Sequence, residues 1–190
     1  MTRDDARSCL CSACHRALSF IPEYYGCSRL HPRLHSRSHS RTEAMDKSGQ
    51  LLVEHPQTAG HTLAEQMIVP DDIYQIRAVV SRWIADAEVQ AIITTGDTGV
   101  TGRDGIPEAI TPLLDKELPG FGEIFRMVSY QEIKTSTVQS CALAGGANDT
   151  YIFCLPGSSG ACRTGWNVLI NDQLDAHQVA GPMAGIQLVV

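Results

Sequence analysis

The sequence lacks any stretch that approaches the roughly 18 consecutive apolar residues of a membrane-spanning helix. Its first residues, MTRDDARSC, contain acids and no sustained apolar segment, which is not the pattern of a secretory signal peptide. An even set of cysteines is also missing, because the chain has 7, and such a count favours reduced thiols over a disulfide framework. These absences predict a cytoplasmic protein with no membrane partner.

Clustered positive charge is scarce over most of the chain. Residues 1–42 carry seven Arg and three acids, a net charge of +4, so the total of −6 leaves −10 on residues 43–190. Nucleic-acid backbones are bound largely by clustered Lys and Arg, so the acidic body argues against a nucleic-acid partner. The 43% hydrophobic content of 190 residues suffices for one ordinary globular domain.

The basic segment at residues 1–42 differs from the rest. It shows no convincing strand or amphipathic helix, and it repeats Arg and His at short intervals, so we expect it to be poorly ordered. Three cysteines and a histidine have a spacing compatible with tetrahedral zinc: Cys11, Cys14, Cys27 and His31. Pro22 and Gly26 interrupt the interval where a zinc finger usually has its helix, which argues against that site. A metal or interaction module added to the main domain is the alternative interpretation of this segment.

The remainder alternates between strand and helix patterns. A helix from Ser48 is expected to end early at Pro56, with a short strand at Leu63–Val69. Apolar residues recur at helical spacing over residues 72–86, and the buried strand VQAIIT follows at 89–94. A helix opened by Pro107 is predicted over 107–118, and residues 151–174 repeat strand, glycine turn and helix. This alternation predicts an α/β layered fold.

A glycine-rich loop, TTGDTGVTGRDG, joins the buried strand to the helix at Pro107. Gly96 and Gly99 in such a position allow backbone N–H groups to surround a phosphate, although a plain turn explains the spacing equally well. Arg103 can pair with an anion and Asp104 can hold Mg²⁺. Their simpler interpretation is a solvated Arg and a helix-capping Asp.

Two further features belong to the same argument. Asp71 and Asp72 precede the helix over 72–86, so at least one of them is expected to cap it. Asp71 contributes to a site only if it approaches Asp104, as two strand-to-helix turns at one sheet edge would permit. The second glycine turn, Pro156 to Gly160, is expected at this edge too, and two such turns favour a ligand cleft.

Residues 46–176 closely resemble the MoaB/MogA family of molybdenum cofactor biosynthesis proteins, the molybdopterin adenylyltransferases. The resemblance rests on DKSGQLL, IVPDDIYQIRA, TTGDTGVTGRD with PEA, DKELPGFGEIFRMVSYQEIKTSTVQS, and LPGSSGACR followed by QLDA. It implies a three-layer α/β/α fold with a mostly parallel sheet, a molybdopterin-binding domain at 43–178, and a homotrimer or hexamer. It also implies transfer of AMP from MgATP to molybdopterin, and a downstream partner that inserts molybdenum.

The resemblance assigns roles to individual positions. Asp71 and Asp104 match the family's two acids, expected to support Mg²⁺ and catalysis. Other positions are expected to bind the substrate, because they match the family's two binding loops or lie within them. They are Gly96, Asp97, Thr98, Gly99, Arg103, Pro156, Gly157 and Ser158.

The sequence departs from the family pattern at several places. Asp97 replaces a loop glycine, where its charge would either repel a bound phosphate or bind Mg²⁺. Ile106 stands where the family usually has Thr, and Cys141 where it usually has Arg, which removes an anion partner. The family's first strand is not found in residues 1–42, and residues 179–190 form an atypical tail. A catalytically impaired molybdopterin-binding relative is therefore the alternative function.

Overall fold

Two apolar strands form the centre of the fold, β4 (Ala91–Thr95) and β7 (Thr150–Leu155), and they pair in parallel. All residues of both strands are buried. Ala91 and Ile93 pack into one hydrophobic cluster, whereas Ile92 packs into another on the opposite face of the sheet. A strand that is apolar on both faces needs cover on both, so the sheet lies between two helical layers.

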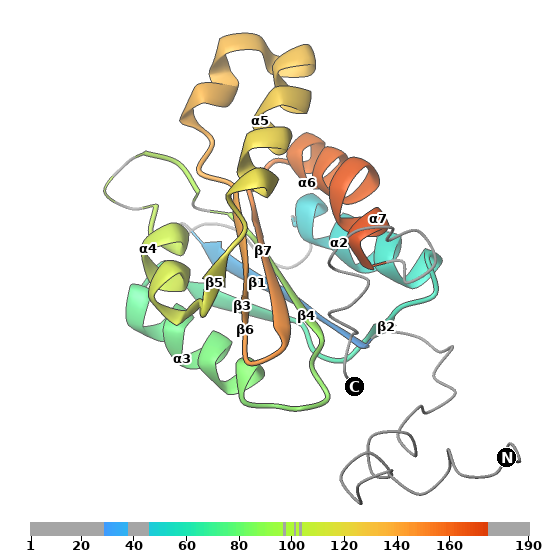
Figure 1. Ribbon diagram of the computed structural model, residues 1–190, viewed down its shortest axis with the longest axis vertical. Helices are drawn as coiled ribbons and strands as arrows, with labels where there is room; N and C mark the ends of the chain where they lie inside the picture. The colour runs from blue at the N-terminus through green and yellow to red at the C-terminus, as the bar shows by residue number, and fades with distance from the viewer. Residues whose placement is uncertain (1–28, 38–45, 97, 101, 103, 175–190) are drawn as a thin grey trace, which may run out of the picture.

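The computed structural model describes residues 46–96, 98–100, 102 and 104–174, and the backbone of residues 29–37. Its seven-stranded sheet has the order β2-β1-β4-β7-β6-β5, with β3 also paired to β1 (Figure 1). The strands β1, β2, β3, β4 and β7 pair in parallel, while β6 is antiparallel to β5 and β7. The other strand bounds are Arg29–Arg37 (β1), Thr62–Leu63 (β2), Met67–Pro70 (β3), Lys116–Glu117 (β5) and Leu143–Ala147 (β6).

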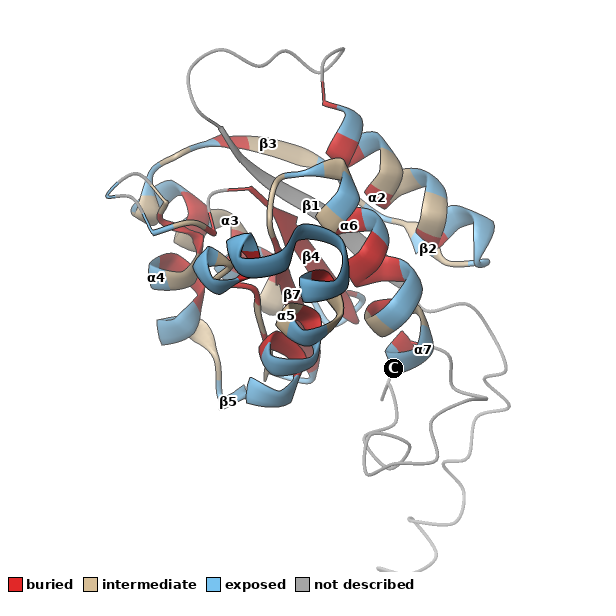
Figure 2. Cartoon of the chain, turned by 90° about the horizontal axis from the view of Figure 1, so that it is seen from above, coloured by how far each residue is buried: buried red, intermediate tan, exposed pale blue. Residues whose placement is uncertain are grey.

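One helical layer covers the face of the sheet on which Ala91 and Ile93 pack. It contains α2 (Lys47–Thr58), α5 (Pro119–Ile133), α6 (Ser159–Gly165), the π-helical turn η4 (Trp166–Ile170) and α7 (Asn171–Leu174). The other layer contains α3 (Ile73–Ile84) and α4 (Ile106–Ile110). Figure 2 shows the buried residues concentrated on the central strands and on the inward sides of these helices. The prediction of a three-layer α/β/α fold with a mostly parallel sheet is confirmed.

The strand β1 corrects a prediction. No strand was expected in residues 1–42, yet Arg29–Arg37 lies between β4 on one side and β2 and β3 on the other. Its register against β4 shifts between Pro32 and Leu34, as expected where Pro provides no N–H for the ladder. Without β1, the strand β4 and the strands β2 and β3 would have unpaired backbone N–H and C=O groups along the edges that face each other. These groups need hydrogen-bond partners whatever the side-chain pattern of the segment that supplies them. The remainder of the basic segment, with Cys11, Cys14 and Cys27, lies outside the described residues, as does the tail 179–190.

Two helix boundaries also differ from expectation. Pro56 lies inside α2, which continues to Thr58, because a proline in the last turn removes only one hydrogen bond. The helix predicted over 107–118 ends at Ile110 and passes into the 3₁₀ turn η2 (Thr111–Leu113). Pro112 provides no N–H there, and Leu114 is already extended, with φ −80° and ψ 131°. No helix within the described residues is long and apolar enough to cross a membrane.

Candidate functional site

The two glycine loops meet at one edge of the sheet. They follow β4 and β7, which are adjacent and parallel, with Thr95 opposite Leu155 at their carboxyl ends. Gly96 has φ 114°, a conformation that side-chain-bearing residues rarely adopt. A Cβ atom on Gly157 would lie only 3.0 Å from the Gly96 Cα, so both loops require glycine where they touch.

Hydrogen bonds hold each loop against its neighbours. The Gly96 N–H donates to the Leu155 carbonyl at 3.1 Å, and the Cys141 N–H donates to the Thr98 carbonyl at 2.9 Å. The Ser48 hydroxyl donates to the Gly157 carbonyl at 2.7 Å. Because the Gly96 N–H is already engaged, the structure gives Gly96 a conformational role in shaping the loop.

Asp104 packs against the first loop. A Cβ on Gly99 would lie 2.6 Å from Asp104 Oδ2, so the carboxylate occupies the space that the glycine leaves. A Cβ on Gly105 would lie 3.6 Å from Asp71 Oδ1, which places the Asp71 carboxylate beside the residue that follows Asp104. Both acids therefore lie near the turn that leads into α4, whereas a direct approach of Asp71 to Asp104 stays a prediction.

Two other residues near the site cap helices, of which only Asp72 was expected to do so. Asp72 caps α3, because its carboxylate accepts from the Gln75 N–H at 2.9 Å. Ser158 caps α6, because its Oγ accepts from the Ala161 N–H at 3.2 Å. Gly105 is the residue before α4, and Ile106 is a fully buried core residue there. Asp97 and Arg103 lie outside the described residues.

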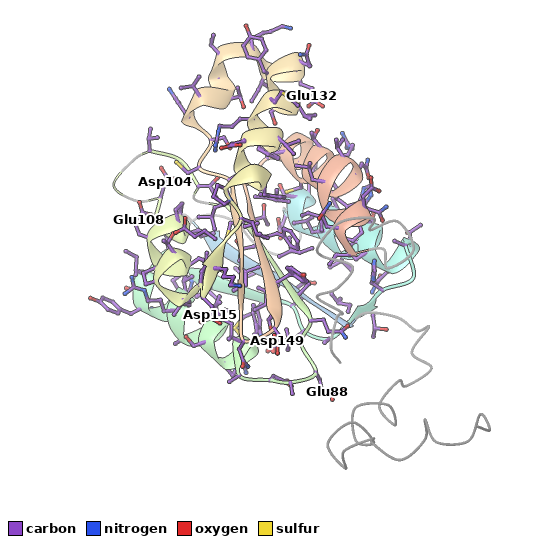
Figure 3. The ribbon with its side chains drawn as sticks, in the orientation of Figure 1. Glu88, Asp104, Glu108, Asp115, Glu132 and Asp149 are labelled. Atoms are coloured by element: carbon purple, nitrogen blue, oxygen red, sulfur yellow. The ribbon has the colours of Figure 1, made fainter. Side chains whose placement is uncertain are left out.

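A cavity of ≈ 370 Å³ opens beside the two loops. This volume falls in the range of small-molecule sites in proteins. Six of its lining residues come from the loops and the following turn that the sequence singled out: Thr98, Gly99, Asp104, Pro156, Gly157 and Ser158. Gly96 and Asp71, which were also predicted for the site, are not among the residues that line the cavity. Figure 3 shows Asp104 on the loop before α4 and Glu132 on α5, on separate elements that both contribute to the lining.

The opposite wall was missed by the sequence interpretation. It comes from α5, from the 3₁₀ segment η3 (Lys134–Gln139) and from the residue after η3. The residues that contribute to it are Phe125, Ser129, Glu132, Ile133, Ser136, Gln139 and Ser140. The spacing of Phe125, Ser129 and Glu132 by four and three residues places them on one face of α5, and this periodicity is the only signal that the sequence offers for the wall. The Ser140 Oγ is buried and has no hydrogen-bond partner among the described residues.

The charge of the cavity is unusual for an anion site. Its described lining contains the acids Asp104 and Glu132 and no Lys, Arg or His. Two carboxylates with backbone and hydroxyl groups suit a ligand that brings its own cation or its own N–H donors. A phosphate alone would meet repulsion here.

The acids at this edge fit the Mg²⁺ that the resemblance implies. Asp104 lines the cavity and the Asp71 carboxylate lies beside Gly105, and both side chains carry the hard oxygen donors that Mg²⁺ prefers. No group of three or more His, Cys, Asp or Glu able to hold a metal occurs in the described part of the chain. Mg²⁺ is commonly bound through one or two carboxylates plus substrate phosphates and water, so a pair of acids suffices.

The described cysteines are not placed as nucleophiles. Cys154 and Cys162 are fully buried, and burial raises the pKa of Cys154 to about 12. The Cys162 Sγ lies 3.1 Å from the Thr95 Oγ, beneath the second loop. Cys141 is half-buried, and its backbone N–H supports the first loop.

The fold and the site together define a class of protein. It is a three-layer α/β protein with a small-molecule cavity at the carboxyl ends of its parallel strands, bounded by two touching glycine loops and an acid.

The family follows from comparison with known proteins. Residues 29–176 match the family model described as a probable molybdopterin binding domain. The chain is 53% identical over 135 residues to molybdenum cofactor biosynthesis protein B of Escherichia coli strain K12, covering 71% of this chain and 79% of that protein. It is 45% identical over 139 residues to the Bacillus subtilis protein of the same name, covering 73% and 81%. The chain therefore belongs to the molybdenum cofactor biosynthesis protein family.

Solved structures agree with this assignment. A crystal structure of molybdenum cofactor biosynthesis protein B superimposes with a TM-score of 0.74 at 40% identity, covering 83% of this chain and 96% of that one. The tungsten cofactor synthesizing protein MoaB from Pyrococcus furiosus gives a TM-score of 0.64 at 36% identity, covering 76% and 89%.

Proposed function

We propose that this protein binds molybdopterin and transfers AMP to it from MgATP. The observation that carries the proposal is the cavity where the two glycine loops meet, with Asp104 packed on Gly99 at its edge. Membership of the family supports molybdopterin as the ligand. The chain thus acts as a nucleotidyltransferase in molybdenum cofactor biosynthesis.

The proposed reaction needs no covalent intermediate on the protein. An oxygen of the molybdopterin phosphate attacks the α-phosphorus of ATP, a new P–O bond forms, and the bond to the β-phosphate bridging oxygen breaks. Pyrophosphate leaves with that electron pair. Such transfers depend on positioning the reacting groups and on neutralising the negative charge that accumulates.

The chain's residues would serve these two needs. The loops at Thr98–Gly99 and Pro156–Ser158 are held rigidly by backbone bonds and by Ser48, so they fix the position of a bound ligand. Asp104 and Asp71 would hold Mg²⁺, which supplies the charge neutralisation that the described cavity wall lacks. Without basic lining residues, we expect ATP to bind far more weakly in the absence of the metal.

A molybdopterin-binding protein without transfer activity is the second candidate. It is favoured by Cys141, which contributes no positive charge beside the first loop although the family usually has Arg there. The two candidates agree on binding and differ only in turnover.

The test is an adenylylation assay with molybdopterin and MgATP, comparing the parent protein with Asp104→Asn. The variant keeps the size of the side chain and removes its charge, so turnover should fall by about two or more orders of magnitude while the melting temperature stays within a few degrees. Turnover near the parent value in Asp104→Asn would contradict the role of Asp104. Binding of molybdopterin without any turnover of the parent would establish the second candidate.

We also propose that the protein assembles as a homotrimer or hexamer in the cytoplasm and passes its product to a protein that inserts molybdenum. Several large apolar side chains of α5 and η3 are exposed, which supports an interface there: Ile124, Met127, Tyr130, Ile133 and Val138. Light scattering that gives the mass of three or six chains would agree with this assembly, and the mass of one 20.6 kDa chain would contradict it.

A further inference from the structure

The wall of the cavity farthest from the sheet carries a carboxylate of its own. Glu132 lies seven residues after the buried Phe125 on the same face of α5, about 10 Å further along the helix at 1.5 Å per residue. In Figure 1, α5 projects away from the sheet, and Figure 3 labels Glu132 on this helix, apart from Asp104. It is thus separate from the acids beside the first glycine loop.

Glu132 is held in a defined position by the neighbouring helix. The Thr164 hydroxyl donates to Glu132 Oε1 at 2.9 Å. Thr164 is 7% exposed and lies on the same face of α6 as Gly160 and Ala161, which line the cavity. A hydrogen bond from a buried hydroxyl across two helices orients the carboxylate, which still has lone pairs for further donors.

The surroundings determine which ligand groups Glu132 can accept. No Lys, Arg or His among the described lining residues neutralises it, so an anionic group next to it would be repelled. An N–H donor would instead form a charge-assisted hydrogen bond, which is stronger than a neutral one. Two parallel N–H donors on the edge of a heterocycle match the two oxygens of a carboxylate.

We propose that Glu132, oriented by Thr164, is a specificity-determining residue that accepts hydrogen bonds from the 2-amino and N3–H groups of the pterin ring. This inference rests on the proposed function, because it assumes that the cavity takes a pterin. The phosphate end of the ligand then lies at the glycine loops and the pyrimidinone edge lies at α5. Glu132 selects the 2-amino-4-oxo ring over heterocycles that lack the amino group.

The test uses two synthetic probes that differ at one position. One is a 2-amino-4-oxopteridine with a phosphomethyl side chain, and the other is the corresponding pteridine-2,4-dione. Calorimetric titration of both into the parent protein should show a preference of about ten- to a hundredfold for the amino compound. In Glu132→Gln the preference should fall below about threefold, and in Thr164→Val it should fall to an intermediate value. Glu123→Gln, on the same helix but outside this cavity, should keep the parent preference.

Each alternative result has a distinct meaning. If the parent prefers the amino compound and Glu132→Gln keeps that preference, or weakens both probes equally, the role of Glu132 is refuted while the proposed function stands. If the parent binds both probes equally well, the role of Glu132 is likewise refuted and the proposed function still stands. If the parent binds neither probe, the proposed pterin site itself is refuted. A Thr164→Val protein with the parent preference would refute the positioning role of Thr164.

Discussion

Adding a single methyl group at Gly99 should lower the rate of catalysis while leaving the stability of the fold nearly unchanged. In the structure a Cβ at this position would lie 2.6 Å from Asp104 Oδ2, 2.9 Å from Cγ and 3.1 Å from Oδ1. Ordinary contact begins near 3.4 Å, so the carboxylate in Gly99→Ala must move by about 0.8 Å. A displacement of about 1 Å at a catalytic group can reduce turnover by about a hundredfold.

The stability of Gly99→Ala should change little. The atoms that the methyl meets are the end of a side chain, which can shift, and Gly99 does not have the positive φ of Gly96. Replacing Gly by Ala at a compatible position reduces the entropy of the unfolded chain and stabilises by about 0.4–1 kcal/mol. We therefore expect a melting temperature equal to that of the parent or slightly higher.

The matched control is Gly102→Ala in the same loop, where a Cβ meets nothing within 4 Å. Adenylylation of molybdopterin, followed by pyrophosphate release, should be near the parent rate for Gly102→Ala and about a hundredfold slower for Gly99→Ala. Equal rates for the two variants, or an equal loss in both, would refute the argument that the Gly99–Asp104 contact positions the carboxylate.

Two further predictions concern stability. In Gly157→Ala a Cβ would meet the Gly96 Cα at 3.0 Å, and since backbone cannot move aside easily the variant should lose about 1–3 kcal/mol of unfolding free energy. Gly160→Ala in α6, where a Cβ meets nothing within 4 Å, should melt at or slightly above the parent temperature, and a drop of similar size in both variants would contradict this explanation. Burial raises the pKa of Cys154 from 9.0 to about 12, so the unfolded thiol ionises first and stability should fall by about 1.4 kcal/mol per pH unit as pH rises from 9 to 12. Denaturant titrations across this range should show a smaller decline for Cys154→Val, and an identical decline would exclude this thiol as its source.

Much of the fold could be predicted because its signals are local. The apolar residues of α3 recur at helical spacing, and the strand at Ala91–Thr95 is apolar on both faces, so each pattern has one plausible structure. The two glycine loops could be placed at one sheet edge because parallel strands bring their carboxyl ends together. Strand β1 could not be predicted, because its pairing depends on gaps between strands that lie far along the chain.

Only the wall of the cavity that the glycine loops form could be predicted from the sequence. The glycine and acid positions stand out in the sequence, and the structure places Gly99 against Asp104 and Gly157 against Gly96. The polar residues of the opposite wall are ordinary Ser, Gln and Glu residues, mostly on α5 and η3, which on the sequence alone resemble a solvated helical face. Only the packing of α5 beside α6, with Thr164 bonded to Glu132, shows that this face borders the cavity.

The most direct test of the central claim is a single-turnover reaction of stoichiometric protein, molybdopterin and MgATP, analysed by mass spectrometry of the released pterin. We expect molybdopterin to gain the mass of one adenylyl group, with one pyrophosphate released per product and no product when Mg²⁺ is removed by a chelator. Recovery of molybdopterin of unchanged mass from a protein that binds it would contradict the claim that this chain is an adenylyltransferase.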